Sequence, residues 1–554
     1  MSEKTMRSIE ADDLYRFQLV SDCQISPDGS RVVFCVERVD RDSEKKYTNL
    51  WLVQTDDGRA RQLTHGDQID RHPRWSPGGQ TLAFMSNRED EDQSQIYLLP
   101  MTAGGEARSL TAMKGSFDNF QWSPDGRELV CQFRKKDQEA IEREADPVRK
   151  ELGIVARHIT RVFYKLDGAG YLPQERWHIW TIDVETGVSQ QLTDGQICDE
   201  LSPCWSPDGR QIAFLSNRRP DPDLEPDATD VFIIPASGQA TEADFKCLET
   251  PPGNKSLLSF SPDSRYLAFI GQDTPAGWWK NNGIWLSPQD GSAPVRDITA
   301  PYDIDVGNGT LGDIADRPTF RPIWSADSRR IYFQVGQNGS TGLYSITPEG
   351  DDLRAEVSSA GVVGAFSLDE ANDGLAYCYG AFADPGNIWF RTLRQGESRQ
   401  LTHFNEKLVA QIDLGQIEEV WFQGADDNRL QGWIVKPPGF DPKKRYPAIL
   451  EIHGGPWLQY GNTFMHEFYY LAAQDYVVGF CNPRGGQGYG EKHSQAIANG
   501  WGTVDYADLM AFADLLADQA YIDPARMGVA GGSYGGYMTA WIIGHTDRFK
   551  AAAA

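Results

Sequence analysis

Trp205-Ser206-Pro207-Asp208-Gly209, followed after one residue by the apolar run Gln211-Ile212-Ala213-Phe214, is the clearest copy of a pattern that recurs along this chain. Proline presets the backbone angle at the second position of a tight turn, and Asp-Gly accepts the bend that follows. The aromatic residue in front of the turn can anchor the preceding strand in a core. The pattern therefore predicts a strand, a tight turn and a second strand.

Six further copies of this turn occupy the first three quarters of the chain. They begin at Ile25, Trp75, Trp122, Phe260, Trp324 and Phe366, and the last three are weaker. Each turn is followed by a second strand-like run with an aromatic residue, at residues 50–53, 96–99, 179–182, 231–234, 284–286, 343–346 and 388–390. Repeats of this length with short strands are typical of β-propeller blades. We therefore expect an all-β, seven-bladed β-propeller over residues 20–410, after an N-terminal segment of residues 1–19.

The third repeat carries an insertion near residues 135–176, because Ser123 and Ser206 are much further apart than the other turn serines. Its first part is charged and helix-prone, Pro147 is expected to open a second short helix, and residues 158–164 are expected to form an extra strand. A solvated decoration and a loop that reaches the C-terminal domain or a second subunit both remain open.

From residue 411 to 554 the pattern changes, because strands now alternate with helices, which is typical of a mostly parallel sheet. We expect strands at residues 418–422, 429–436, 446–452, 476–481 and 527–530, and a helix at residues 505–518. The second part of the chain is thus expected to be an α/β domain.

The stretch Gly531-Gly532-Ser533-Tyr534-Gly535 matches the pattern GxSxG and lies between a predicted strand and a predicted helix. Such a nucleophile elbow presents a serine at a helix N-terminus in the α/β-hydrolase fold. The turn is so sharp that the residues two before and two after the serine crowd together, so Gly531 and Gly535 avoid a clash of side chains. Ser533 is therefore the predicted nucleophile of a serine hydrolase.

A tetrahedral intermediate on Ser533 needs hydrogen-bond donors for its oxyanion. We expect the backbone N–H of Tyr534 to be one donor and that of Gly455, in the loop His453-Gly454-Gly455-Pro456, to be the other. His453 precedes the nucleophile, whereas this fold orders its triad as serine, acid and histidine. We therefore do not assign His453 as the base.

The motifs His453-Gly-Gly-Pro456, Asn482-Pro-Arg-Gly485 and Gly531-Gly-Ser-Tyr-Gly-Gly536, in this order after a propeller, resemble the prolyl oligopeptidase family of serine peptidases. The resemblance covers nearly the whole chain. It implies hydrolysis of short peptides through an acyl-enzyme, with the propeller restricting access to the serine.

Two departures favour the acylaminoacyl-peptidase-like branch, and hence short or N-acylated peptides as substrates. The prolyl and dipeptidyl branches place a tyrosine hydroxyl in the oxyanion loop, where His453 stands here. The dipeptidyl branch also binds the substrate's free amine with a Glu-Glu pair in its propeller domain. The only adjacent glutamate pair here is Glu418-Glu419, at the start of the hydrolase.

A third departure concerns catalysis. The family's catalytic Asp and His lie beyond the helix that follows the nucleophile, whereas this sequence ends at Ala554. We therefore expect a hydrolase domain that is truncated at its C-terminus, with an open sheet edge beside the elbow strand, and a chain that is inactive as read. A carboxylesterase with the same elbow and a non-catalytic propeller scaffold remain as alternatives.

Composition excludes several other functions. The net charge of −26 argues against nucleic acid and anionic membranes as partners. The first residues lack the apolar core of a signal peptide, and none of the eight cysteines forms a CxxC pair. Histidine spacings typical of metal sites are lacking as well. We expect a cytoplasmic protein without metal or cofactor that acts on short peptides, and the sequence leaves a homo-oligomer open.

Overall fold

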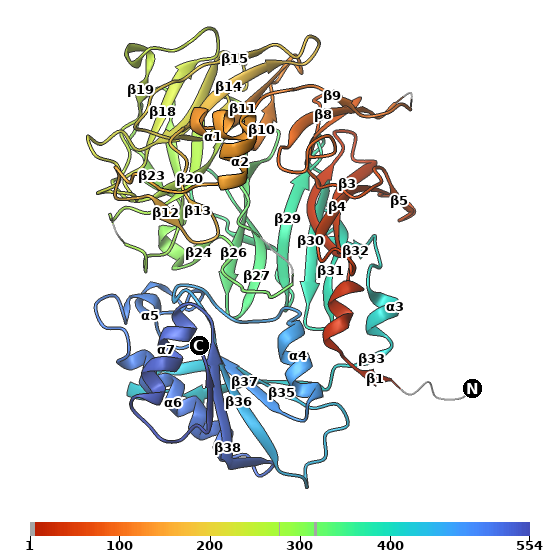
Figure 1. Cartoon of the computed structure of the whole chain (residues 1–554), viewed down its shortest axis with the longest axis vertical. Helices are drawn as coiled ribbons and strands as arrows, with labels where there is room; N and C mark the ends of the chain where they lie inside the picture. The colour runs from red at the N-terminus through yellow and green to blue at the C-terminus, as the bar shows by residue number, and fades with distance from the viewer. Residues whose placement is uncertain (1–5, 103, 276, 315–317) are drawn as a thin grey trace.

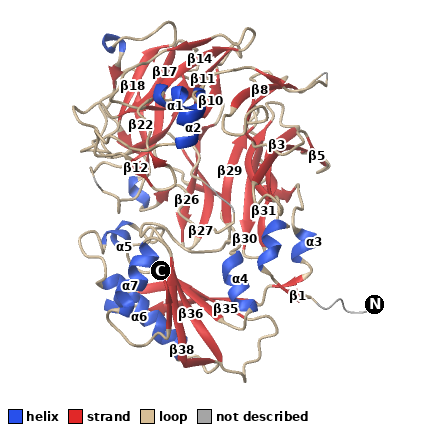
Figure 2. Ribbon diagram, viewed as in Figure 1, coloured by secondary structure: helices blue, strands red, loops and turns tan. Residues whose placement is uncertain are grey.

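The chain folds into a large all-β part and a smaller α/β part (Figure 1). The structure is a computed structural model that describes residues 6–102, 104–275, 277–314 and 318–554. Of the N-terminal segment predicted at residues 1–19, the first five residues lie outside the described ones. Figure 2 shows that strands dominate the upper part and that the longer helices flank the sheet of the lower part.

Five four-stranded antiparallel sheets follow one another along the all-β part. The first comprises β2 (Leu19–Ile25), β3 (Arg31–Val39), β4 (Lys46–Gln54) and β5 (Ala60–Gln62). The second comprises β6 (Asp70–Trp75), β7 (Thr81–Ser86), β8 (Gln95–Pro100) and β9 (Arg108–Ser109). The third comprises β10 (Gly115–Trp122), β11 (Glu128–Lys135), β14 (Trp177–Asp183) and β15 (Ser189–Gln191). The fourth comprises β16 (Glu200–Trp205), β17 (Gln211–Ser216), β18 (Asp230–Pro235) and β19 (Lys246–Cys247). The fifth comprises β20 (Lys255–Phe260), β21 (Tyr266–Gly271), β22 (Gly283–Pro288) and β23 (Arg296–Asp297).

A nine-stranded sheet completes this part. Its strands are β24 (Asp305–Val306), β25 (Ile323–Trp324), β26 (Ile331–Gln337), β27 (Ser340–Ile346), β28 (Arg354–Val357), β29 (Val362–Leu368), β30 (Gly374–Ala381), β31 (Asp384–Thr392) and β32 (Glu397–Gln400). The two halves of the sheet meet only where Thr341 of β27 pairs in parallel with Val362 of β29.

Side-chain hydrogen bonds within the repeated turn explain its sequence. In the copy at Ser206, the serine hydroxyl donates to Asp208 at 2.6 Å and accepts the backbone N–H of Gln211 at 2.9 Å. In three other copies the tryptophan in front of the turn also links adjacent sheets: Trp75 donates its indole N–H to the carbonyl of Gln24, 3.0 Å away in the preceding sheet. Trp122 and Trp324 make equivalent bonds. The motif therefore joins neighbouring sheets as well as turning the chain.

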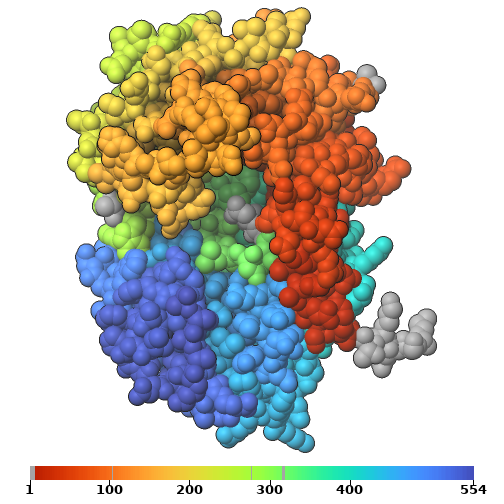
Figure 3. Space-filling model, viewed as in Figure 1, coloured from red at the N-terminus to blue at the C-terminus, as the bar shows by residue number. Residues whose placement is uncertain are grey.

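The insertion in the third sheet contains two short helices and a small hairpin. The helices are α1 (Gln138–Ala145) and α2 (Pro147–Leu152), and Pro147 opens the second helix as predicted. The hairpin pairs β12 (Lys165–Leu166) with β13 (Gly170–Tyr171). In Figure 3 the orange-yellow insertion overhangs a hollow above the blue α/β domain.

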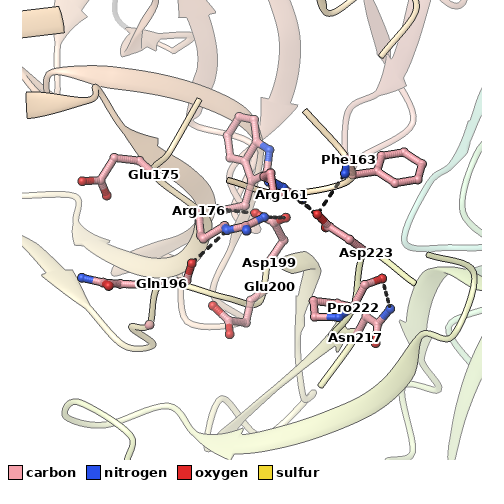
Figure 4. Close-up of polar contacts among 12 residues, drawn as sticks. Arg161, Phe163, Glu175, Arg176, Gln196, Asp199, Glu200, Asn217, Pro222 and Asp223 are labelled. Carbon is pink, nitrogen blue, oxygen red and sulfur yellow. Dashed lines mark hydrogen bonds and ion pairs between the residues drawn. The ribbon is translucent and has the colours of Figure 1, made fainter. Parts of the chain in front are cut away.

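The strand predicted at residues 158–164 is wrong, because this segment pairs with no other strand. Its polar groups bind a side chain instead. Arg161 donates to both carboxylate oxygens of Asp223, at 2.9 and 2.5 Å, and the Phe163 N–H donates to the same carboxylate at 3.0 Å (Figure 4). One half-buried aspartate on the loop between β17 and β18 therefore replaces the strand pairing that the sequence pattern suggested.

The α/β part is a six-stranded sheet in the order β34-β35-β37-β36-β38-β39, antiparallel at β34 and β35 and parallel in the rest. Its strands are β34 (Gln416–Gln423), β35 (Arg429–Lys436), β36 (Tyr446–Ile452), β37 (Val477–Cys481), β38 (Ile522–Gly531) and β39 (Ala551–Ala553). The elbow strand β38 is longer than predicted. The open edge expected beside β38 is wrong in the structure, because β39 pairs with it.

Helices cover both faces of this sheet. The helices of this part are α4 (His466–Ala473), α5 (Glu491–Gln495), α6 (Val504–Ala517) and α7 (Tyr534–Ile543), and the short α3 (Glu406–Val409) precedes it. Apolar residues of α6 and α7 pack on one face and those of α4 on the other. Ile9 and Phe17 of the N-terminal segment join the second cluster, and β1 (Arg7–Ser8) pairs with β33 (Ile412–Asp413). This segment therefore packs on the α/β part.

Candidate active site

Ser533 stands exposed at the N-cap of α7, separated from the end of β38 only by Gly532. Its backbone angles, φ 58° and ψ −122°, lie in a region that non-glycine residues rarely adopt, and such strain gathers at functional sites. A β-carbon at Gly531 would lie 2.6 Å from the carbonyl oxygen of Ile452, and one at Gly535 would overlap that oxygen. Both predicted elbow glycines are therefore required by the tight packing of the elbow against β36.

The loop after β36 passes directly beside the serine. A β-carbon built on Gly454 would lie 3.4 Å from Cβ of Ser533 and 4.0 Å from its Oγ. In the described part of the chain, no hydrogen bond uses the backbone N–H of Gly455 or of Tyr534. The N–H of Tyr534 is also the first of α7, where the helix dipole favours negative charge. The N–H of Tyr534, next to the serine in the chain, and that of Gly455, next to Gly454 in the loop, thus have no protein acceptor among the described residues.

His453 is fully buried and takes no part at Ser533. Its Nδ1 lies 2.8 Å from the carbonyl oxygen of Gly454. Its Nε2 faces Gly486, where a β-carbon would lie 3.6 Å from it. Burial lowers the pKa of His453 to about 4, so its imidazole is neutral at pH 7. The structure therefore gives His453 a role in the loop rather than that of a base.

The structure brings no imidazole to Ser533. Within residues 6–102, 104–275, 277–314 and 318–554, no hydrogen bond involves Ser533 Oγ. His545, two residues beyond the end of α7, stacks on Trp541 with ring centroids 4.2 Å apart and contacts the Trp541 carbonyl. The same residues contain no group of three or more His, Cys, Asp or Glu that could hold a metal ion.

Asp505 is a site residue that sequence reasoning missed. Tyr534 donates its hydroxyl to Asp505 at 2.5 Å, and burial together with this carboxylate raises the pKa of Tyr534. The fully buried carboxylate also accepts the backbone N–H groups of Gly502, Thr503 and Tyr506. Its position at the start of a predicted helix was the available signal. The contact fixes the residue whose N–H flanks the nucleophile.

An aromatic cluster beside the serine joins both parts of the chain. The Trp501 ring meets those of Tyr534 and Tyr537 with centroids 5.2 and 5.7 Å away. Trp278, on the propeller loop between β21 and β22, lies edge-on to Trp501 at 6.1 Å. Trp501 and Tyr537 are 42% and 36% exposed, so an apolar surface adjoins Ser533. Sequence reasoning missed Trp501 and Trp278, since no local motif contains them.

Two family models match the chain: the prolyl oligopeptidase family at residues 462–554 and the TolB β-propeller domain at residues 17–154. The chain is 34% identical over 551 residues to the uncharacterized peptidase YuxL of Bacillus subtilis, covering 98% of this chain and 81% of that protein. It is 26% identical to dipeptidyl-peptidase 5 of Porphyromonas gingivalis, covering 96% of this chain and 76% of that protein.

Solved structures share the fold. The acylaminoacyl peptidase of Pyrococcus horikoshii superposes with a TM-score of 0.79 at 22% identity, covering 97% of this chain and 77% of that one. A puromycin-hydrolyzing peptidase of Mycobacterium tuberculosis gives a TM-score of 0.71 at 19% identity, covering 99% and 80%. At these identities the likeness establishes a β-propeller joined to a hydrolase domain. It does not establish a substrate.

Proposed function

Because this chain belongs to the prolyl oligopeptidase family of serine peptidases, we propose that it cleaves short peptides, N-acylated ones included, through an acyl-enzyme on Ser533. The observation that carries the proposal is the exposed, strained Ser533, with an unused N–H on the next residue, Tyr534, and another on Gly455 in the adjoining loop. Preorganised donors of this kind stabilise the charge that develops on a carbonyl oxygen during acyl transfer.

The proposed reaction has two stages. Ser533 Oγ attacks the peptide carbonyl carbon and loses its proton, while the N–H groups of Gly455 and Tyr534 stabilise the resulting oxyanion. The C–N bond then breaks, the amine leaves with a proton, and water hydrolyses the serine ester. Both stages need a general base, and no imidazole of the described residues hydrogen-bonds to Ser533 Oγ.

We also propose that the all-β part is a seven-bladed propeller over residues 20–410, followed by the hydrolase domain at residues 411–554. The five four-stranded sheets and the single parallel pairing that joins the halves of the nine-stranded sheet support this count. A cytoplasmic location and the lack of nucleic-acid or membrane partners stay predictions from composition. Among the described residues, no helix has the length and apolarity needed to span a membrane.

Three substrates test the proposed activity: an acetyl-peptide anilide, a free dipeptide anilide and a simple ester. Each is measured with and without added imidazole, against Ser533→Ala. We expect kcat/KM for the acetyl-peptide to exceed that for the ester by about tenfold or more, since remote contacts of the peptide lower the barrier. A preference for the ester would favour a carboxylesterase, and turnover that survives Ser533→Ala would contradict the proposal.

A further inference from the structure

The loop after β36 that carries the Gly455 N–H, here called the oxyanion loop, leads directly to a residue whose side chain binds the propeller. Gln459 lies four residues after Gly455, and its side chain is completely buried. The other end of the loop is fixed where β36 ends at Ile452. Whatever holds Gln459 therefore fixes the second end of the loop that carries the Gly455 N–H.

The Gln459 side chain uses both ends of its carboxamide on the propeller. Its Nε2 donates to Thr310 Oγ1 at 2.8 Å and to the Ser340 carbonyl at 3.1 Å. Its Oε1 accepts the Gly339 N–H at 2.9 Å. These partners come from two propeller segments, one after β24 and one at the turn between β26 and β27.

The Gln459 backbone continues the same contact. Its N–H donates to the Gly309 carbonyl, its carbonyl accepts the Leu311 N–H, both at 2.9 Å, and residues 310 and 459 form a parallel β-bridge. The two backbones are tightly packed next to this contact, since a β-carbon on Gly461 would overlap the Gly339 carbonyl. The propeller and this loop therefore meet in a fixed, fully hydrogen-bonded contact.

The stretch of loop next to Gln459 has open space beside it. A pocket of about 380 Å³ lies between Leu458 and propeller residues that include Thr310 and Leu311. An open pocket means that packing alone does not confine Leu458 on that side. On the hydrolase side, the Gln487 N–H donates to the Leu458 carbonyl at 3.0 Å, and Asn482 binds the backbone of Tyr460. On the propeller side, the hydrogen bonds of Gln459 hold this end of the loop.

We propose that Gln459 is a positioning residue through which the propeller holds the oxyanion loop, so that an intact propeller contact is needed to place the Gly455 N–H beside Ser533. This inference rests on the proposed function for the role of that N–H. It assigns the propeller a part in the chemistry beyond restricting access, because three of its residues, Thr310, Gly339 and Ser340, bind the side chain at the end of the loop.

Amide hydrogen exchange of residues 453–458 tests the inference in the whole chain. Gln459→Glu keeps the shape and the acceptor for Gly339 but removes both Nε2 donors. Thr310→Val removes an acceptor from the propeller side. In both variants we expect exchange in the loop to speed by about tenfold or more while β36 and β38 exchange as before. Tyr469→Phe is the control, because it removes a different contact between the two parts, a 2.7 Å bond from α4 to the Phe382 carbonyl.

Two outcomes would overturn the inference: loop exchange that matches the unchanged chain in both variants, or an equal rise in Tyr469→Phe. Fluorophosphonate labelling of Ser533 in the same samples separates this inference from the proposed function. Faster loop exchange in a protein whose Ser533 never reacts would support the coupling and contradict the peptidase proposal alone. Where Ser533 does react, the peptidase kcat of Gln459→Glu is expected to fall with little change in KM, because the oxyanion forms only after binding.

Discussion

The hydroxyl of Tyr534 donates a 2.5 Å hydrogen bond to the buried carboxylate of Asp505, which links the residue after the nucleophile to the start of α6. Asp505 also accepts three backbone N–H groups from its own segment. The elbow and the start of α6 are separate local structures, so this bond between them is a tertiary contact. It restrains the position of Tyr534, whose backbone N–H is the proposed oxyanion donor.

Removing the Tyr534 hydroxyl is therefore expected to cost stability. In Tyr534→Phe the buried Asp505 loses a donor, and the free energy of unfolding is expected to fall by about 1–3 kcal/mol. Tyr537→Phe, an exposed tyrosine three residues on, is the control and is expected to change stability by less than about 0.5 kcal/mol. Urea unfolding measures both, and an equal effect of the two substitutions would contradict the proposed restraint.

The elbow glycines differ sharply in the space around them. A β-carbon at Gly535 would overlap the Ile452 carbonyl, whereas one at Gly532 would meet nothing within 4 Å. Gly535→Ala is therefore expected to lower the free energy of unfolding by about 2 kcal/mol or more, or to prevent folding. Gly532→Ala is expected to change it by less than about 0.5 kcal/mol. Thermal unfolding of the two variants measures these changes. A Gly535→Ala variant as stable as the unchanged chain would show that the elbow packs less tightly against β36 than described.

Glu451 makes stability depend on pH. Burial, helped by the nearby charge of Glu467, raises the pKa of Glu451 to about 8. Because the folded state keeps this proton while the unfolded state loses it near pH 4.5, the contribution of Glu451 to stability falls as pH rises from about 4.5 to about 8.

Glu451→Gln is therefore expected to match the unchanged chain near pH 4.5 and to exceed its free energy of unfolding by about 2 kcal/mol or more at pH 9. The exposed Glu370→Gln serves as the control, with no pH-dependent difference expected. Urea unfolding across this pH range checks the prediction. A constant difference between Glu451→Gln and the unchanged chain at all pH values would show that Glu451 is not protonated in the folded state.

Asp223 anchors the insertion over the hollow of Figure 3. Asp223→Ala leaves Arg161 and the Phe163 N–H without their partner, so residues 158–164 are expected to become mobile. Limited trypsin digestion at Arg157 and Arg161 is expected to speed by about tenfold, and the length preference for peptide substrates is expected to change if the insertion lines the substrate path. Asp227→Ala, an exposed aspartate nearby, is the control. Unchanged digestion would mean that other contacts hold the segment.

Local patterns predicted much of this fold. The turn at Ser206 forms as expected because its bonds join residues within five positions, and β36 spans the predicted residues 446–452 because it is a buried run between a turn and glycines. The strand predicted at residues 158–164 was wrong because Asp223, distant in sequence, binds the polar groups of this segment.

The same contrast between local and long-range contacts holds for the candidate active site. Ser533, Gly531 and Gly535 follow from one motif, since the elbow is a local structure. Asp505 and Gln459 could not be found, because their partners lie 29 and 149 residues away. No spacing rule of one sequence links such positions, and only the packed structure brings them together.

The most direct test of the account is the rate at which a fluorophosphonate modifies Ser533 in the polypeptide of residues 1–554, with and without added imidazole. A serine hydroxyl is a weak nucleophile without an adjacent base, and no imidazole of the described residues contacts Ser533 Oγ. We expect slow labelling that maps to Ser533, that added imidazole accelerates and that Ser533→Ala abolishes. Labelling that survives Ser533→Ala, or rapid labelling of Ser533 that imidazole leaves unchanged, would contradict the account.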